Sequence, residues 1–316
     1  GSTMTVTRTT IDGNLATGPD ATHGGGGIFN NGGTLMINQS TVSNNQSTGA
    51  AANGGGLHVK TGTAMIMTST FSGNASANHG GGIYANNNDV VLLNAVTVAM
   101  NMAMVNGGGF YNNNSMIATD IKNSIVSQNT AVSGMDLFGA FSSGGYNIAG
   151  TDAGSMFIPA TGDLEDANPL LGPLANNGGT TLTHALLQGS PAYNAGNPAD
   201  MFNDQIDMPV FDAIRDIGAL ESQVSLGIEE FLAGNGRNSH IYPNPSRDGL
   251  INIAFASVIS EEVHGRVVEV GSGRVVHEFS SQTPVSQLDL SKNASGVYVI
   301  HLSSNNLNES HKVVLE

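Results

Sequence analysis

A twelve-residue pattern recurs five times before residue 130, and it constrains the fold more than any other feature of the chain. The windows read TMTVTRTTIDGN, TLMINQSTVSNN, TAMIMTSTFSGN, VVLLNAVTVAMN and ATDIKNSIVSQN. Each window has an apolar residue at its fourth and ninth positions and closes on an asparagine. The closing residues are Asn14, Asn45, Asn74, Asn101 and Asn129, so the repeat lengths are 31, 29, 27 and 28 residues.

A three-glycine tract separates successive windows and is followed by an apolar residue. These tracts end before Ile28, Leu57, Ile83 and Phe110. One unit of this length cannot bury its own apolar face, so neighbouring units must stack. We therefore predict a right-handed parallel β-helix, in which equal positions of successive turns lie about 4.8 Å apart. The apolar columns form its interior, and the asparagines form a ladder at a corner, where Asn tolerates left-handed φ and bonds the next turn.

Composition agrees with many short strands. The chain of 316 residues contains 42 Gly, and its charged fraction of 11% is less than half the usual ~25%.

The net charge of −15 excludes nucleic acid as the expected partner, since phosphate binding needs clustered basic residues. There is no apolar run of ~18 residues to span a membrane, and the absence of Cys excludes thiolate chemistry. The sequence opens inside the pattern, so we interpret Gly1 as a processed start with further turns ahead of it.

The twelve-residue windows and glycine tracts no longer recur after residue 162. Residues 163–221 contain Asn168-Pro169-Leu170-Leu171, Asn177-Gly178-Gly179, Gly189-Ser190-Pro191-Ala192 and Asp216-Ile217-Gly218-Ala219. This ending resembles that of the choice-of-anchor Q domain proteins, bacterial surface β-helices of the pectin-lyase-like superfamily, and the resemblance covers roughly residues 20–221. It implies that 1–221 is one β-helix domain and that 163–221 is its closing segment. One departure is that only Arg215 is basic in the stretch before Asp216, where family members usually carry more basic residues.

The tail is organised differently again. Residues 222–240 mix small polar residues and are expected to be a linker. From 241 onward, short alternating runs are separated by turn residues, a spacing that predicts a small immunoglobulin-like β-sandwich. The predicted fold class is therefore all-β, with the sandwich following the β-helix.

Several motifs in this tail occur in a fixed order. Together they resemble the type A C-terminal sorting domain of type IX secretion system cargo from Bacteroidota. Val270 departs from the family, which usually has Asp or Asn there. The motif residues are Tyr242, Pro243, Asn244, Pro245, Gly249, Gly273, Arg274, Gly296, Tyr298 and Lys312.

The resemblance implies an export route through the periplasm and the outer membrane to the cell surface or the medium. The expected partners are the outer-membrane translocon and a sortase-like processing protease. The alternative interpretation of 241–316 is an ordinary immunoglobulin-like accessory module.

An active site is not evident in residues 1–221. Lyases of the superfamily need a basic residue beside acids, but Arg8, Lys60, Lys122 and Arg215 occupy different places in their turns. Hydrolases need paired carboxylates, and Asp12, Asp20, Asp89 and Asp120 are isolated in the repeats. We therefore predict no catalytic residues. The open alternative is a polysaccharide lyase or hydrolase whose site lies on turns ahead of Gly1.

Ligand sites are equally sparse. Among the acids of residues 200–216, Asp204, Asp207 and Asp212 are the candidates for Ca²⁺, the one cofactor considered, and a solvated acidic loop is the favoured alternative. Phe29, Tyr84, Phe110 and Tyr111 follow the glycine tracts; they would form either a sugar-stacking column or, as favoured, ordinary packing. The histidines before or near the tracts are interpreted as corner residues bonded to backbone rather than zinc ligands. They are His23, His58, His79 and His184.

These observations predict a secreted or cell-surface β-helix cargo, a stalk or adhesin, with a surface polysaccharide as its candidate ligand.

Overall fold

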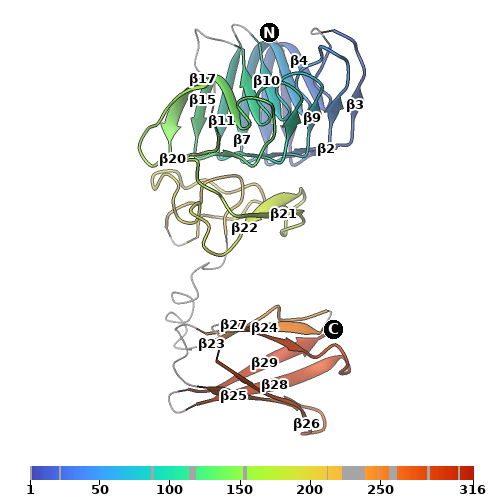
Figure 1. The fold of residues 1–316 in the computed structure, drawn as a ribbon, viewed down its shortest axis with the longest axis vertical. Coiled ribbons are helices and arrows are strands. Elements are labelled where there is room, and N and C mark those ends of the chain that lie inside the picture. Colours follow the sequence, from blue (N-terminus) through green and yellow to red (C-terminus); the bar gives the residue numbers. More distant parts are fainter. Residues whose placement is uncertain are drawn as a thin grey trace. The chain divides into compact units, whose positions relative to one another are not determined.

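The computed structural model describes residues 2–20, 23–86, 89–113, 119–151, 155–211, 213–222, 239–247, 249–255, 262–282, 285–304 and 307–316. The chain divides into two compact units, Gly1–Gln223 and Val224–Glu316. All regular elements in the described ranges are strands (Figure 1), which confirms the all-β prediction. None of those ranges contains a helix of the length and apolar character that crossing a membrane requires. The predicted linker, residues 222–240, lies mostly outside the described residues.

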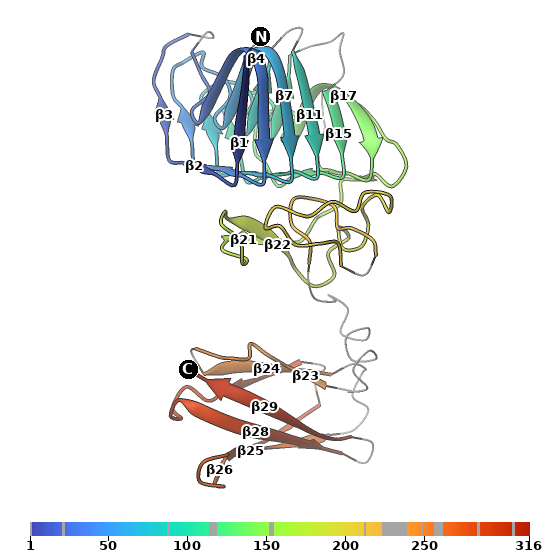
Figure 2. The same cartoon turned by 180° about the vertical axis from the view of Figure 1, so that it is seen from behind.

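The first unit is a parallel β-helix of three sheets, whose long strands stand side by side in Figure 2. The first sheet contains β1 (Thr3–Thr7), β4 (Ile28–Asn38), β7 (Leu57–Met67), β10 (Ile83–Ala85), β11 (Val90–Asn94), β14 (Phe110–Asn112), β15 (Thr119–Lys122), β17 (Leu137–Gly145) and β19 (Ser155–Ile158). The second contains β2 (Thr10–Asp12), β5 (Thr41–Ser43), β8 (Thr70–Ser72), β12 (Thr97–Ala99), β16 (Ile125–Ser127), β18 (Ile148–Ala149) and β20 (Leu164–Glu165). The third contains β3 (Leu15–Ala16), β6 (Gln46–Ser47), β9 (Ala75–Ser76) and β13 (Met102–Ala103).

Equal positions of the repeat pair directly, as the sequence predicts. Ile37 of β4 lies opposite Ile66 of β7, and Val42 of β5 lies opposite Phe71 of β8. These side chains belong to one buried cluster that runs through the turns from Val6 to Phe157. The apolar side chains of each turn pack on those of the next turn, so the interior is continuous. This confirms the β-helix prediction.

The corner beside the asparagine column differs from the expectation in one respect. The ladder asparagines do not have positive φ; the residue just before each of them does. The left-handed residue changes the direction of the chain. The side-chain amide of the asparagine that follows it then points along the stack toward the next turn. The left-handed residues are Gly13, Asn44, Gly73, Met100 and Gln128, with φ between 54° and 67°.

The closing segment lies along the second sheet rather than over the end of the stack, as Figures 1 and 2 both show. The Thr41 hydroxyl donates to Leu182 O at 2.5 Å, and the Ala219 N–H donates to Thr97 Oγ1 at 3.0 Å. The segment begins with β20, which still pairs with β18, and its hairpin joins β21 (Leu171–Ala175) to β22 (Thr183–Leu186). The outer threonines of several turns therefore serve as its docking points.

The second unit packs two antiparallel sheets around a separate core. The three-stranded sheet has the order β23 (Ser239–Tyr242), β24 (Leu250–Phe255), β27 (Val285–Asp289). The four-stranded sheet has the order β26 (Val275–Ser281), β25 (Val263–Glu269), β28 (Gly296–Ser303), β29 (Asn308–Leu315). Alternation in β28 directs Tyr298 and Ile300 into the core while His301 remains exposed, so this internal strand buries one face only.

Candidate functional site

The asparagine column of the β-helix is a continuous hydrogen-bonded ladder. In each step the backbone N–H and the side-chain amide of one asparagine both donate to Oδ1 of the next, as from Asn45 to Asn74 at 3.0 Å for each bond. The same amide also donates to a backbone carbonyl of the preceding turn, such as Asn74 Nδ2 to Val42 O at 2.9 Å. Asn45, Asn74 and Asn101 are fully buried, so these bonds satisfy groups that have no access to water.

The ladder ends on a carboxylate. Asn129, its last asparagine, donates from backbone N and from Nδ2 to Oδ1 of Asp136, both at 2.8 Å. Asp136 stands at the third position of the tract that reads Gly-Gly-Gly in the earlier turns. In those turns a side chain is excluded: a Cβ on Gly109 would lie 2.6 Å from Asp136 O and 2.7 Å from Asn129 Nδ2. Asp136 thus takes the place that an asparagine of a further turn would occupy.

A second column ends in the same way at the corner between the first and second sheets. The Ser124 N–H donates to Oδ1 of Asn147 at 2.9 Å. Asn147 then donates from backbone N and from Nδ2 to Oδ1 of Asp163, at 2.8 and 2.9 Å. Both ladders present N–H groups toward the C-terminal end of the stack, and an ionised acceptor gives the stronger, charge-assisted bond there.

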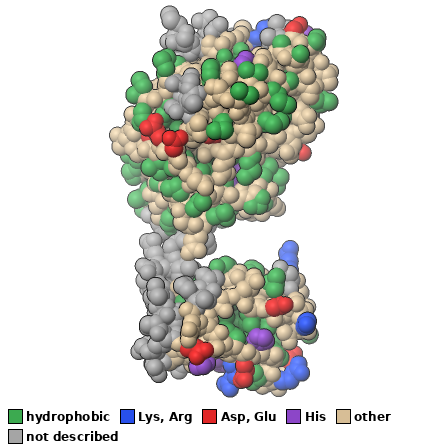
Figure 3. Space-filling model, viewed as in Figure 1, with side chains coloured by type: hydrophobic (Ala, Val, Ile, Leu, Met, Phe, Trp, Pro, Cys, Tyr) green, Lys and Arg blue, Asp and Glu red, His purple; other side chains and the backbone are tan. Residues whose placement is uncertain are grey.

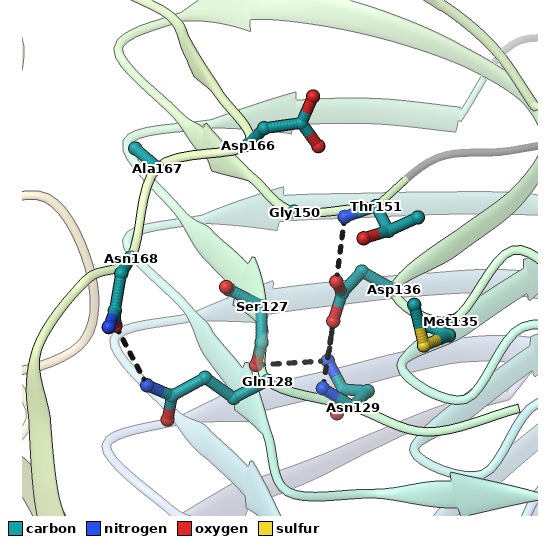
Figure 4. Close-up of a pocket in the computed structure, with 10 residues that line it drawn as sticks. All are labelled: Ser127, Gln128, Asn129, Met135, Asp136, Gly150, Thr151, Asp166, Ala167 and Asn168. Atoms are coloured by element: carbon teal, nitrogen blue, oxygen red, sulfur yellow. Dashed lines mark hydrogen bonds between the residues drawn. The ribbon is translucent and has the colours of Figure 1, made fainter.

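A polar pocket of about 390 Å³ opens where the corners of the last turns meet (Figure 4). Its floor is Asp136, and Gly150 is required above it because a Cβ there would lie 2.2 Å from Asp136 Oδ2. Gln128 Nε2 donates to Asn168 Oδ1 at 3.0 Å across the rim. The lining residues are Ser127, Gln128, Asn129, Met135, Asp136, Gly150, Thr151, Asp166, Ala167 and Asn168.

Two carboxylates face this pocket, a pairing that sequence reasoning missed. Burial raises the pKa of Asp136, the bonds from Asn129 and Thr151 oppose that shift, and the charge of Asp166 adds to it. Asp166 is exposed and has a φ of 53°. Both Asp136 oxygens are already engaged, since Oδ2 accepts the Thr151 N–H at 2.8 Å. The replacement of a tract glycine by Asp136 was the signal in the sequence.

Two of the three Ca²⁺ candidates are engaged by other groups of the protein. Asp204 is buried, and its Oδ1 accepts the Met208 N–H at 2.8 Å while its Oδ2 accepts the Glu221 N–H at 2.8 Å. Asp207 pairs with Arg8 at 2.6 Å, and Asp212 lies outside the described residues. The described residues contain no group of three or more His, Cys, Asp or Glu side chains placed to hold a metal ion.

Buried charge is concentrated around Arg215 in the closing segment. Burial lowers the pKa of Arg215, and four nearby acids, Glu221 foremost, oppose that shift. Burial also raises the pKa of Asp216 to about 6 and that of Glu221 to about 7. Glu221 Oε2 accepts the Asp216 N–H at 2.9 Å, and Asp216 Oδ1 accepts the Asn194 N–H at 2.7 Å. The carboxylates of this cluster accept backbone N–H groups of the closing segment and so fix the conformation of its irregular backbone.

The other predicted basic residues are separated. Lys122 pairs with Asp200 at 2.6 Å, Arg8 pairs with Asp207, and Lys60 lies on β7. They form no basic group among the described residues.

The aromatic residues after the glycine tracts divide between core and surface. Phe110 is fully buried and packs on Phe141 at 5.2 Å. The residue after the apolar position of each tract carries a ring, and ring centroids of neighbouring turns lie 4.8–5.3 Å apart. The first two pairs are edge-to-face and the last two are stacked. This column consists of Phe29, His58, Tyr84, Tyr111 and Phe138. His58 and Tyr84 are buried, Tyr111 and Phe138 are half-buried, and Phe29 is exposed.

The four candidate histidines do not converge. His184 bonds Gly172 O at 2.7 Å and Ser72 Oγ at 2.9 Å, and His23 pairs with Asp20 at 2.7 Å. His79 stacks on Tyr111 at 4.5 Å, and Nδ1 of both His58 and His79 lacks a hydrogen-bond partner among the described residues.

In the second unit, the Pro-Asn-Pro segment is bound to the last strand. Asn244 Nδ2 donates to Lys312 O at 2.7 Å, and the Val314 N–H donates to Asn244 Oδ1 at 2.9 Å. The peptide bonds before Pro243 and Pro245 are both cis. Pro243, Pro245, Arg247 and Glu316 line a surface pocket of about 470 Å³. The first and last segments of the sandwich therefore form one surface.

The remaining motif residues fall into structural and exposed groups. Gly249 has a φ of 74°, and a Cβ there would lie 2.5 Å from Ser291. The buried Tyr298 donates its hydroxyl to Ala294 O at 2.6 Å, and Gly273 turns the β25–β26 hairpin with a φ of 69°. Gly296 begins β28. Tyr242, Arg274 and Lys312 are exposed.

A buried cluster of Ser239, Glu309 and His311 also lies in this unit. Ser239 Oγ is 2.7 Å from His311 Nε2, and Glu309 Oε2 is 3.3 Å from the same nitrogen. Ser239 Oγ donates to Glu309 Oε2, so its hydrogen is directed to the carboxylate and not to the imidazole.

Comparison with known proteins identifies the second unit. Residues 240–316 match the secretion system C-terminal sorting domain. No curated protein matches the chain. The sorting domain marks proteins that are exported to the cell surface or secreted, and it acts through the type IX secretion machinery. The chain is therefore secreted cargo that carries its export signal in residues 240–316.

Proposed function

We propose that residues 1–221 form a non-catalytic surface cargo, a stalk or adhesive β-helix of the choice-of-anchor Q kind that contacts surface polysaccharide. One observation carries the non-catalytic part. Of the five buried acids among the described residues, Asp136, Asp204, Asp216 and Glu221 accept backbone N–H groups, and Asp89 is the one with an oxygen, Oδ2, that has no partner. An acid whose oxygens accept backbone N–H groups stabilises the fold, whereas a catalytic acid must keep an oxygen free for substrate.

For the sorting domain, the proposed partners are the outer-membrane translocon and a sortase-like protease. Tyr242, Arg274 and Lys312 are its exposed motif residues, and these are the side chains we assign to recognition. Asn244, Gly249 and Tyr298 support the sandwich.

The test is incubation of the full chain with a panel of bacterial and plant polysaccharides. We expect binding to at least one polysaccharide, measured by co-sedimentation, without release of unsaturated or reducing ends. Turnover would refute the non-catalytic proposal, and the absence of binding to every polysaccharide would refute the polysaccharide contact.

A second candidate, a glycoside hydrolase, is favoured by the pocket at the end of the stack. Inverting and retaining hydrolases use two carboxylates, one of them with a raised pKa, and Asp136 and Asp166 line this pocket together. Asp136 would have to release the N–H group of Asn129 or Thr151 to act on a substrate, so this candidate ranks second. If turnover is found, Asp166→Asn should abolish it while leaving the ladder intact. Turnover that persists in Asp166→Asn would place the site elsewhere.

A further inference from the structure

Methionine has an unusual distribution in this protein. Methionine is among the residue types most often buried in folded proteins, yet every methionine in the described ranges is exposed. Met116, the twelfth, lies outside those ranges. The exposed methionines are Met4, Met36, Met65, Met67, Met100, Met102, Met104, Met135, Met156, Met201 and Met208.

Three of these side chains gather on the outer face of the first sheet. Met36 of β4 lies directly opposite Met65 of β7, and Met67 follows two residues later. Their exposed fractions are 41%, 40% and 38%. The intervening Ile66 is buried, so Met65 and Met67 point outward together.

The spacing suits a single ion. Neighbouring strands lie about 4.8 Å apart, and residues two apart on one strand are separated by about 6.6 Å. A methionine side chain has three rotatable bonds, so all three sulfur atoms can reach one point above the sheet. Met100, Met102 and Met104 differ, because Met100 turns the chain with a φ of 60° and only Met102 of the three lies on a strand, β13.

Thioether sulfur is a soft, neutral ligand that selects Cu(I) among biological metals. The neighbouring positions on this face are uncharged: Asn38 lies opposite Met67 on one side and Asn94 on the other. Lys122, one strand beyond Asn94, is paired with Asp200. The chain contains no Cys to compete for such an ion, and its net charge is −15, which attracts cations.

We propose that Met36, Met65 and Met67 form a binding site for a soft monovalent metal cation, with Cu(I) as the ion. The site is independent of the proposed contact with polysaccharide and of export. It is tested on the purified full chain.

The first measurement uses Ag(I) as an air-stable probe and protein carrying ¹³C-methyl methionine. We expect the first equivalent of Ag(I) to shift the methyl signals of Met36, Met65 and Met67 together, ahead of the other methionines. A first equivalent that shifts histidine ring signals, or the methyl signals of Met100, Met102 and Met104, would overturn the proposal.

The second measurement is competition for Cu(I) with a colorimetric chelator without oxygen. The variant Met36→Leu/Met65→Leu/Met67→Leu should bind Cu(I) at least about tenfold more weakly, a change of ~1.4 kcal/mol. The matched variant Met100→Leu/Met102→Leu/Met104→Leu should stay within about twofold of the parent. Because leucine replaces outward methionines, circular dichroism and the thermal midpoint should be unchanged in both. Equal affinity of the parent and the first variant would refute the site.

Discussion

At the scale of single residues, Asp136 shows how a repetitive stack can end within its own sequence. Each ladder asparagine needs an acceptor in the next turn, and the last one finds it seven residues further along the chain. The amides are aligned head to tail, which strengthens successive bonds. A carboxylate at the donating end completes the series without another turn.

Replacement of that acceptor should be costly. Asp136→Ala leaves the Asn129 amide and the Thr151 N–H without their partner, and buried donors left unpaired cost about 3 kcal/mol together. Asp136→Asn keeps one oxygen and should cost about half as much. Chemical denaturation of the first unit measures both changes. Asp120, which is exposed on β15, supplies the control: Asp120→Ala should change stability by less than ~0.5 kcal/mol, and an equal loss in both variants would contradict the role of Asp136.

Gly109 tests the reason for the glycine tracts. The Cβ of Gly109→Ala would overlap Asp136 O and Asn129 Nδ2, and overpacking of this kind costs about 3 kcal/mol. Gly13→Ala is the comparison, because Gly13 has a φ of 67° and open space around it, so only backbone strain of ~1 kcal/mol is expected. Thermal unfolding of both variants should rank them in this order. The reverse order would mean that left-handed φ, rather than close stacking, determines where glycine is needed.

At the scale of elements, the closing segment is held by buried acids and should respond to pH. The folded protein raises the pKa of Asp216 to about 6 and that of Glu221 to about 7 through burial. A raised pKa means that the folded state binds the proton more tightly than the unfolded state. The stability from these two groups is therefore fully present below pH ~4 and is lost as pH rises through ~7.

Burial lowers the pKa of His58, His79 and His184 in the same unit, and this opposes the trend below pH ~6.5. We therefore expect the thermal midpoint of the first unit to fall between about pH 6.5 and pH 7.5, where Glu221 still titrates. Glu221→Gln removes one titrating group, so its midpoint should depend less on pH over the same interval, although its stability is lower because the amide cannot accept two N–H groups. Differential scanning calorimetry at constant ionic strength measures both slopes. A midpoint that rises throughout this interval would be inconsistent with protonation at Asp216 and Glu221.

The predictability of these elements from sequence differs for a physical reason. The β-helix was predictable because a turn such as that of Ile37 must place its apolar residues on those of the next turn, and this requirement recurs with each repeat. The closing segment has no period. It docks through single bonds such as that from Ala219 N–H to Thr97 Oγ1, and nothing in the sequence pairs these residues in advance. Asp136 is hard to predict for a related reason, because it stands where the repeat changes and no earlier turn offers an equivalent residue.

At the scale of the whole molecule, the two units differ in charge. On the face drawn in Figure 3, charged and histidine side chains gather on the C-terminal unit, while the first unit shows mainly hydrophobic and uncharged polar ones. Five of the ten Lys and Arg residues and five of the nine His residues lie in 240–316. Residues 240–316 also contain eight Asp and Glu residues, so attraction to a partner of opposite charge would be local to exposed side chains such as Arg274 and Lys312.

Deletion of the sorting domain tests the division of labour between the units. Each unit has its own hydrophobic cluster, so removal of residues 241–316 takes no side chain from the core of the β-helix. We expect the shortened protein to keep its strand signal in circular dichroism and to accumulate in the periplasm of the producing bacterium instead of reaching the surface. Cell fractionation and protease accessibility of intact cells measure its location.

A milder change separates recognition from folding in the same experiment. Arg274→Ala/Lys312→Ala removes two exposed side chains of the sorting motifs, whereas Arg266→Ala removes an exposed basic residue of β25 outside them. The first variant should retain the thermal midpoint of the sandwich yet show less surface display, and the second should be displayed like the parent. Full display of the Arg274/Lys312 variant would assign recognition to other residues of the domain. Full display after deletion of 241–316 would contradict the export role itself, because the signal would then have to reside in the β-helix.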